Sequence, residues 1–137
     1  MSDVTFTVPF VRGKARVRFS RSGHTYTLTG TENAMGDIQM AYRAAAGSKR
    51  APEGAPVSVV ISTLRAMPKS RPKKAGDEEP DVYKPDVDNV AKLVLDALNG
   101  VAWHDDTQVT MLNVSKGMRR RDLDDQTRVH IMWGDGR

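Results

Sequence analysis

The chain opens with alternating apolar and polar residues. Every second position from Val4 to Phe10 is apolar, and the positions between them are polar apart from Pro9. This alternation predicts a half-buried strand. The alternation returns over residues 15–19, and residues 24–30 are expected to form a second arm after a turn around Gly23. The N-terminal part of the chain therefore favours β-structure.

The pattern then changes to a helical period. Thr31 is expected to cap a helix, and Gly47 is expected near its end. The apolar positions between them fall three or four residues apart: Met35, Ile38, Tyr42 and Ala45.

Three further strands and one long loop are expected beyond this helix. Residues 56–66 are rich in β-branched side chains and predict a central strand. Residues 67–84 contain three prolines and mixed charge, which predicts a mobile loop. Residues 108–117 and 127–133 predict two strands joined by a basic turn.

A second helix is predicted directly after the loop. Its apolar stripe consists of Val90, Leu93, Val94, Ala97 and Leu98. Its opposite face carries Asp88, Lys92, Leu95, Asp96 and Asn99. Asp86 is expected at its start, and Asn99 with Gly100 at its end. Leu95, an apolar residue on the polar face, hints at a contact with a second copy.

Length and composition narrow the class of protein. The chain has 137 residues, 39% of them hydrophobic, which suits a single α+β domain over residues 1–137. No cysteine is present, so disulfides and thiolate metal sites are excluded. No apolar run reaches membrane-spanning length and the N-terminus does not resemble a signal peptide. We therefore expect a cytoplasmic location and no membrane partner.

Basic residues gather in three places. The formal net charge is +4, and bases cluster without intervening acids over residues 12–21, 65–74 and 116–121. Each cluster alone is ordinarily a solvated surface. Three clusters in a chain that also carries grouped acids favour binding to a nucleic-acid backbone.

Two pairs of aspartates supply the candidate chemistry. Asp86 and Asp88 lie at the start of the second helix, and Asp105 and Asp106 follow in a later loop. If the two stretches converge, their carboxylates could hold Mg²⁺, which takes oxygen ligands and activates water for phosphate hydrolysis. Lys92, one helical turn from Asp88, could contact the phosphate.

Structural roles explain the same residues equally well. Asp86 can be a helix cap, Asp88 an acid that complements the helix dipole, and Lys92 its ion-pair partner. His104 is more often structural than catalytic, and Trp103 is more often a core residue than a platform for base stacking. Spacing alone leaves both interpretations open.

The stretch from Lys84 to Val109 closely resembles the signature of the RusA-like endodeoxyribonucleases, the Holliday-junction resolvases of bacteria and their phages. The shared features are "KPD-DN", a lysine four residues after the second aspartate, "LDALNG", and a tryptophan followed by "DD-QV". The resemblance extends more loosely to most of the chain. Residues 13–29 depart from the family's pattern of a DNA-facing loop.

The resemblance implies a mixed sheet packed with two main helices, in a Mg²⁺-dependent homodimer that cuts four-way DNA junctions by paired symmetric nicks. Asp86, Asp88 and Asp106 match the catalytic, metal-binding acids, and Lys92 matches the active-site lysine. It stays open whether Asp105 is a further ligand and whether Mn²⁺ can replace Mg²⁺. The bases expected to contact DNA are Arg65, Lys69, Arg71, Lys73, Lys74, Lys84, Lys116, Arg119, Arg120 and Arg121.

Two other functions remain as alternatives. A protein of the same fold could bind branched DNA without cutting it, although the presence of all three acids and the lysine weighs against this. A metal phosphohydrolase for small molecules would leave the basic clusters without a role.

Overall fold

The centre of the molecule is a mixed sheet of four strands. A computed structural model describes residues 1–14, 18–19, 25–26 and 29–134 of the chain. The sheet order is β1–β8–β4–β6, formed by β1 (Ser2–Val8), β8 (Gln126–Trp133), β4 (Val57–Leu64) and β6 (Val109–Lys116). β8 runs antiparallel to both of its neighbours, whereas β4 and β6 are parallel.

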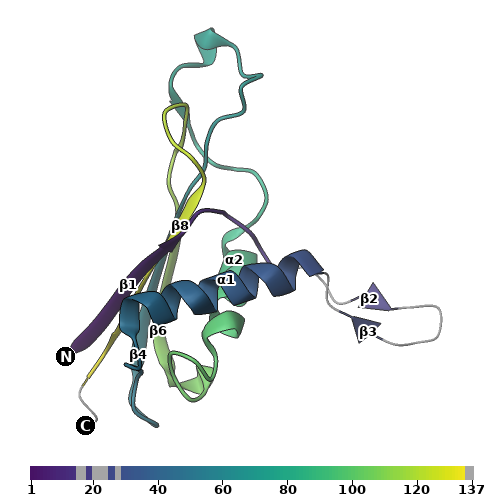
Figure 1. Ribbon diagram of the computed structural model, residues 1–137. Coiled ribbons are helices and arrows are strands. Elements are labelled where there is room, and N and C mark those ends of the chain that lie inside the picture. Colours follow the sequence, from purple (N-terminus) through teal and green to yellow (C-terminus); the bar gives the residue numbers. More distant parts are fainter. Residues whose placement is uncertain (15–17, 20–24, 27–28, 135–137) are drawn as a thin grey trace.

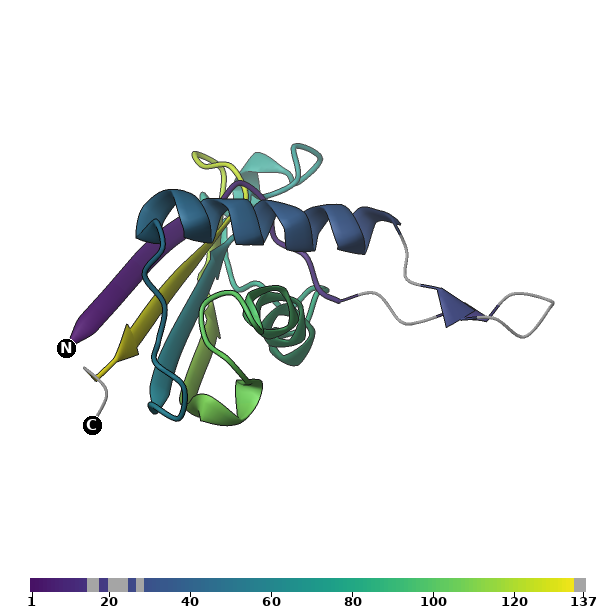
Figure 2. The same cartoon turned by 60° about the horizontal axis from the view of Figure 1, so that its bottom comes forward.

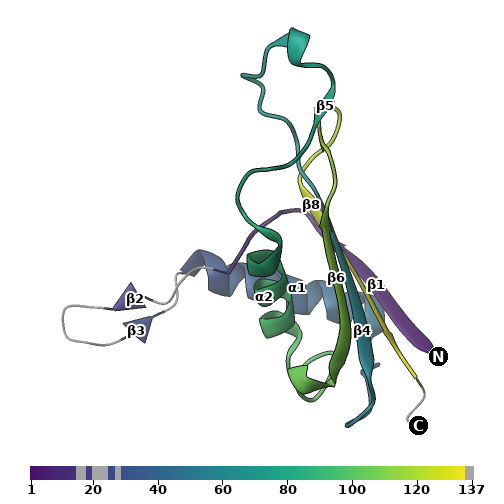
Figure 3. The same ribbon diagram turned by 180° about the vertical axis from the view of Figure 1, so that it is seen from behind.

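Two helices, α1 (Thr29–Ala46) and α2 (Val87–Leu98), cover one face of this sheet (Figures 2 and 3). Parallel strands need a crossover connection, and α2 lies in the crossover from β4 to β6. The predicted α+β fold, with a mixed sheet and two main helices, is confirmed.

The core fills the space between the sheet and the helices. The apolar side chains of β1 at Val4, Phe6 and Val8 are buried, as the alternation predicts. The apolar stripe of α2 is buried at all of its predicted positions. Burial of one such side chain stabilises the fold by about 1.5–3 kcal/mol, so this stripe fixes which face of α2 meets solvent.

The first helix begins earlier than the sequence pattern predicts. It starts at Thr29, so Thr31 lies inside it, and the expectation that Thr31 caps the helix is wrong. Its buried apolar positions are Ala34, Ile38 and Tyr42. Ala45 is exposed, because Ala46 takes the inward position at the end of the stripe. Gly47, with a φ of 63°, follows the helix as predicted, since glycine adopts this conformation without strain.

Two apolar residues lie differently from expectation. Phe10 falls beyond the end of β1, although it packs against the core. Leu95 is partly buried against the core as well, so it gives no sign of a contact with a second copy.

Residues 67–84 form an arm that projects beyond the sheet (Figure 1). The arm contains a short 3-10 helix, η1 (Lys73–Ala75), and a short strand, β5 (Glu78–Glu79). β5 pairs with β7 (Arg119–Arg120), which lies in the segment expected to be only a basic turn. The mobility expected of the arm stays a prediction.

The two arms expected near the N-terminus pair with each other. β2 (Arg18–Phe19) and β3 (Thr25–Tyr26) are antiparallel, and the predicted turn between them lies outside the described residues. No helix within the described ranges is long and apolar enough to cross a membrane.

Candidate active site

Asp86 stands at the start of α2 without acting as its cap. It occupies the N-cap position with extended backbone angles, φ −78° and ψ 163°, but its side chain makes no capping hydrogen bond. The side chain is exposed. The simple structural explanation for Asp86 therefore lacks the bond that would support it, and its carboxylate is available to a ligand.

Asp88 and Lys92 are exposed one turn apart on α2. No ion pair joins them, and within the described residues neither side chain has a hydrogen-bonding partner. Together with Asp86 they place two carboxylates and one ammonium group along the first half of α2, none of them paired with another described residue. This is the combination that a phosphate-directed metal site needs.

An open groove borders Asp86. Its cavity volume is about 590 Å³, and its lining includes Gly13, Lys14 and Lys84. The Lys14 N–H donates to the Asn89 carbonyl at 3.0 Å, which joins the chain before β2 to α2. A Cβ added at Gly13 would come within 2.9 Å of the Asn89 Cβ, so only glycine allows this close approach.

Asp106 lies in η2 (Asp106–Gln108), the short 3-10 helix that follows α2. The indole N–H of the fully buried Trp103 donates to its carboxylate at 2.8 Å. Partial burial raises the pKa of Asp106, and the neighbouring carboxylates Asp96 and Asp105 raise it further, whereas the Trp103 hydrogen bond acts in the opposite direction. Trp103 is thus a core residue that orients Asp106.

Asp105 has a structural role that was not predicted. Its side chain accepts from the Thr107 N–H at 2.9 Å and caps η2. The side chain of Gln108 completes a reciprocal capping box by accepting from the backbone N–H of Asp105 at 3.1 Å. The "DD-Q" spacing therefore builds the turn that presents Asp106, and the S/T/D-x-x-E/Q capping pattern was the available signal.

Replacing Asp106 with asparagine is expected to raise the stability of the fold at neutral pH. A carboxyl group whose pKa is raised by folding binds more protons in the folded state. Its contribution to the free energy of unfolding therefore falls as the pH rises from the unfolded-state pKa through the folded-state pKa. Asparagine removes the charge and keeps an oxygen that can accept from Trp103. Thermal melts at pH 7 and at pH 4 check this: the gain in Tm should be larger at pH 7. Asp105→Ala, which removes the η2 cap, should instead lower Tm.

The predicted acids are divided between the two ends of α2. Asp86 and Asp88 lie at its N-terminal end, whereas Asp106 lies beyond its C-terminal end, near Asp96 (Figures 1 and 3). Asp88 and Asp96 are separated by about 12 Å along the helix axis. Ligands of one Mg²⁺ lie about 2.1 Å from it, hence within about 4 Å of each other. In the part of the chain that the structure describes, no three Asp, Glu, His or Cys residues come together as a metal site.

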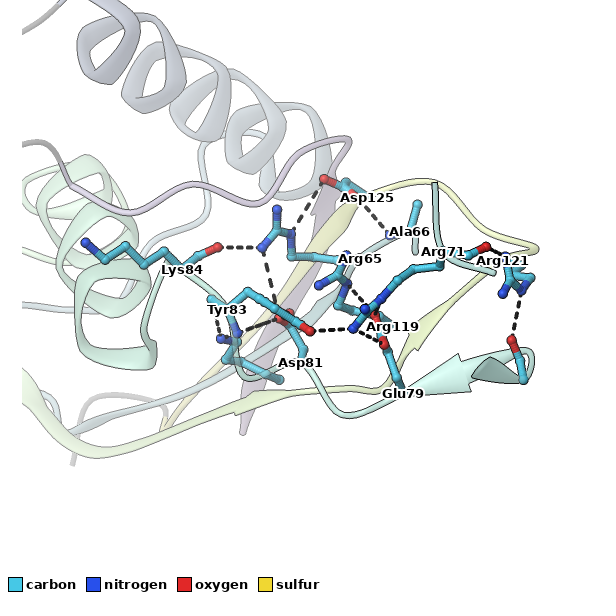
Figure 4. Close-up of polar contacts among 12 residues, drawn as sticks. Arg65, Ala66, Arg71, Glu79, Asp81, Tyr83, Lys84, Arg119, Arg121 and Asp125 are labelled. Carbon is cyan, nitrogen blue, oxygen red and sulfur yellow. Dashed lines mark hydrogen bonds and ion pairs between the residues drawn. The ribbon is translucent and has the colours of Figure 1, made fainter. Parts of the chain in front are cut away.

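Six of the ten bases expected to contact DNA make contacts within the chain, several of them drawn in Figure 4. Arg71 binds the Glu79 carboxylate through two nitrogens, at 2.8 and 3.3 Å. Arg119 is buried, with its guanidinium 3.5 Å from Glu79 and 4.2 Å from the centre of the Tyr83 ring. Arg119 is therefore not a surface residue, and the expectation that it contacts DNA is revised to a role in holding the arm.

Arg120, which ends β7, and Arg121, which directly follows it, show the same pattern. Arg121 donates to the carbonyls of Gly76 and Pro72, each at 2.8 Å, and so holds the tip of the arm. Arg120 pairs with Asp122 at 3.0 Å. Within the arm, Glu79 pairs with Arg71 and Arg119, and Asp77 lies 3.9 Å from the Arg121 guanidinium, so acids of the arm neutralise bases of the same chain.

Four lysines of the predicted set remain exposed, with no ion pair to the described residues. They are Lys69, Lys73, Lys74 and Lys84. The first three belong to the projecting part of the arm around η1, and the last borders the groove beside Asp86. These are the members of the set whose charge is free for a phosphate backbone.

Comparison with known proteins places the chain in a class of endodeoxyribonucleases. Residues 9–132, nearly the whole chain, match the family described as Endodeoxyribonuclease RusA. The chain belongs to this family, which confirms the resemblance seen in the motif. It is also 42% identical over 85 residues to the Uncharacterized protein YqaN of Bacillus subtilis (strain 168), a match that covers 55% of this chain and 60% of that protein. The chain thus spans less than two thirds of that relative's length.

Proposed function

We propose that the protein is a Mg²⁺-dependent endonuclease that resolves four-way DNA junctions as a homodimer, through paired symmetric nicks. The observation that carries the proposal is the uncommitted group of Asp86, Asp88 and Lys92 at the exposed start of α2, in a chain of the RusA family. Structural residues of these types would be expected to cap the helix or pair with each other, and here they do neither.

The chemistry follows from the donor set. Asp86 and Asp88 offer two oxygen-donor side chains, which suits a hard cation, and bound Mg²⁺ would supply a polarised phosphate and an activated water. Lys92 would stabilise negative charge that develops on the phosphate. Asp106, with its raised pKa, would bind metal less well in acid, because a protonated carboxyl must lose its proton before it becomes a ligand.

A homodimer could form one site from acids that lie beside opposite ends of α2. A two-fold axis perpendicular to α2 would set two copies of the helix side by side and antiparallel, in an isologous interface. The N-terminal end of one helix then lies beside the C-terminal end of the other. In that arrangement Asp86 and Asp88 of one copy would approach Asp106 of the second, and two equivalent sites would result. Paired nicks require two such sites.

The free lysines of the arm are proposed to hold the DNA backbone. Replacing Lys73 and Lys74 together with glutamine is expected to weaken binding to junctions and to duplex alike. The slope of log affinity against log salt concentration should become shallower by about 2, because each phosphate contact contributes about 1. Lys49→Gln is the control and should leave the slope unchanged, because Lys49 is an exposed residue just after α1 and lies outside the arm. An unchanged slope in the double variant would remove the arm from the DNA interface.

The proposed function is tested by cleavage of a synthetic four-way junction beside linear duplex of the same sequence. Mg²⁺ is compared with EDTA, and the native protein with Asp88→Asn. Symmetric nicks on the junction alone, absent in EDTA and in the variant, are the expected result. Tight junction binding without nicks, across several divalent metals and junction sequences, would instead establish a DNA-binding protein without catalysis.

A further inference from the structure

One carboxylate of the arm is enclosed among bases close to the proposed active site. The side chain of Asp81 is 1% exposed, and its Oδ1 lies 3.6 Å from the Lys116 ammonium group and 4.0 Å from the Arg65 guanidinium. Its Oδ2 is buried without a hydrogen-bonding partner among the described residues. A buried carboxylate is costly unless cations compensate it, so the three residues form one charge cluster.

The two bases of this cluster also hold the backbone that leads into α2. The Arg65 guanidinium donates to the carbonyl of Lys84, and the Lys116 ammonium donates to the carbonyl of Tyr83 (Figure 4). These carbonyls belong to the last two residues before Pro85 and Asp86. The start of α2 is therefore tied to the cluster directly ahead of its first acid.

The cluster is anchored on the central sheet. Arg65 directly follows β4, and Lys116 is the last residue of β6, so both bases extend from the ends of adjacent paired strands. Arg65 is further held by Asp125, 3.9 Å away. The side chain of Lys116 is 14% exposed and that of Arg65 is 26% exposed, which leaves little of either charge for a phosphate.

We propose that Arg65, Asp81 and Lys116 are positioning residues that fix the place of Asp86, and that they do not grip DNA. The proposal rests on the proposed function, in which Asp86 is a metal ligand. A displacement of about 1 Å at a catalytic group costs about 10²-fold in rate, so a rigid link between the sheet and this segment has a direct catalytic value. Asp81 keeps both bases oriented toward the two carbonyls.

The test separates positioning from DNA contact through Lys116→Met, which keeps the aliphatic stem and removes the donor. Single-turnover cleavage at saturating protein is expected to fall about 10- to 100-fold, and the Mg²⁺ concentration for half-maximal rate is expected to rise. Junction affinity and its salt dependence should stay unchanged. Lys116→Arg should recover most of the rate. Lys73→Gln should differ, with weaker junction binding and a shallower salt dependence.

Two outcomes would overturn the proposal. In the first, Lys116→Met makes the salt slope shallower by about 1 and leaves the saturated rate intact, which is the behaviour of a phosphate contact. In the second, it changes neither rate nor Mg²⁺ requirement. If Lys116→Met does not fold, Asp81→Asn replaces it: the same loss of rate is expected, and an unchanged rate and Mg²⁺ requirement would overturn the proposal.

Failure of the proposed function is recognised separately, because the native protein would then cut no junction. The positioning link is still measurable in that case by NMR. Lys116→Met should shift the backbone amide signals of Lys84 and of residues 86–88, whereas Lys73→Gln should not. Unshifted signals in Lys116→Met would refute the link.

Discussion

Equimolar mixing of Asp88→Asn and Asp106→Asn protomers is expected to restore junction nicking that each variant lacks alone. Each single variant should lose about 10³-fold in cleavage rate, because metal-assisted phosphate chemistry contributes several kcal/mol and each 1.36 kcal/mol is a factor of ten. If every site takes Asp88 from one copy and Asp106 from the other, a mixed dimer has one site with both defects and one intact site. About one quarter of the native number of sites should then be active.

The separation of the acids along α2 is the reason for this expectation. Within one chain Asp88 lies in the first turn of α2, whereas Asp106 interacts with Asp96 in the last turns, and among the described residues no three acids come together as a metal site. The measurement is a nicking assay on variants that have been refolded together, one of them tagged so that mixed dimers can be isolated. Since a mixed dimer has one intact site, it should nick only one strand of each junction.

A matched mixture gives the control. Asp86→Asn and Asp88→Asn change acids at the same end of α2, so every site of their mixed dimer carries one defect and no activity should return. If isolated mixed dimers of one Asp88→Asn copy and one Asp106→Asn copy stay inactive, the sharing of sites between copies is contradicted. A mixture of Asp86→Asn and Asp88→Asn that regains activity would contradict it equally.

The spacing of apolar residues was sufficient to predict the main helices and strands approximately. The α2 stripe, the placement of Asp86 at its start and the four main strands follow from apolar spacing and from glycine and proline signals. These features are local because burial of one face decides them. The predicted beginning of α1, with Thr31 as its cap, was wrong, since the residues before Thr31 carry no strong apolar period.

The partners of the charged residues could not be predicted in the same way. Arg119 and Glu79 lie forty positions apart in the sequence, and only the pairing of β5 with β7 brings them together. A basic cluster in the sequence therefore indicates a local excess of positive charge. It does not show whether those bases pair with acids of the same chain. The separation of Asp88 from Asp106 is likewise a property of how α2 and η2 lie in space.

Gln108→Met is expected to be among the most destabilising substitutions in the chain. The buried Gln108 amide donates to the carbonyls of Pro52 and Ala55 at 2.9 and 3.0 Å, and its oxygen accepts from the N–H groups of His104 and Asp105 at 2.9 and 3.1 Å. Methionine has a similar shape but satisfies none of these groups. A buried polar group left unpaired costs about 1–3 kcal/mol. The bond to the Ala55 carbonyl is buried, the other three are partly buried, and the Pro52 carbonyl still accepts from the Ala55 N–H, so the total is on the order of 3 kcal/mol.

Such a loss is a large part of the stability of a typical domain, about 5–15 kcal/mol. For a chain of this size it corresponds to a fall in Tm of about 10 °C or more. Gln126→Met, at a half-buried residue of β8 whose side chain has no hydrogen bond within the described structure, is the control and should shift Tm by no more than about 2 °C. Equal shifts in Tm for the two variants would show that the hydrogen bonds of Gln108 to residues 52, 55, 104 and 105 do not stabilise the fold. Below its lowered Tm, Gln108→Met should still bind junctions but cut them poorly, because the turn that presents Asp106 depends on this side chain.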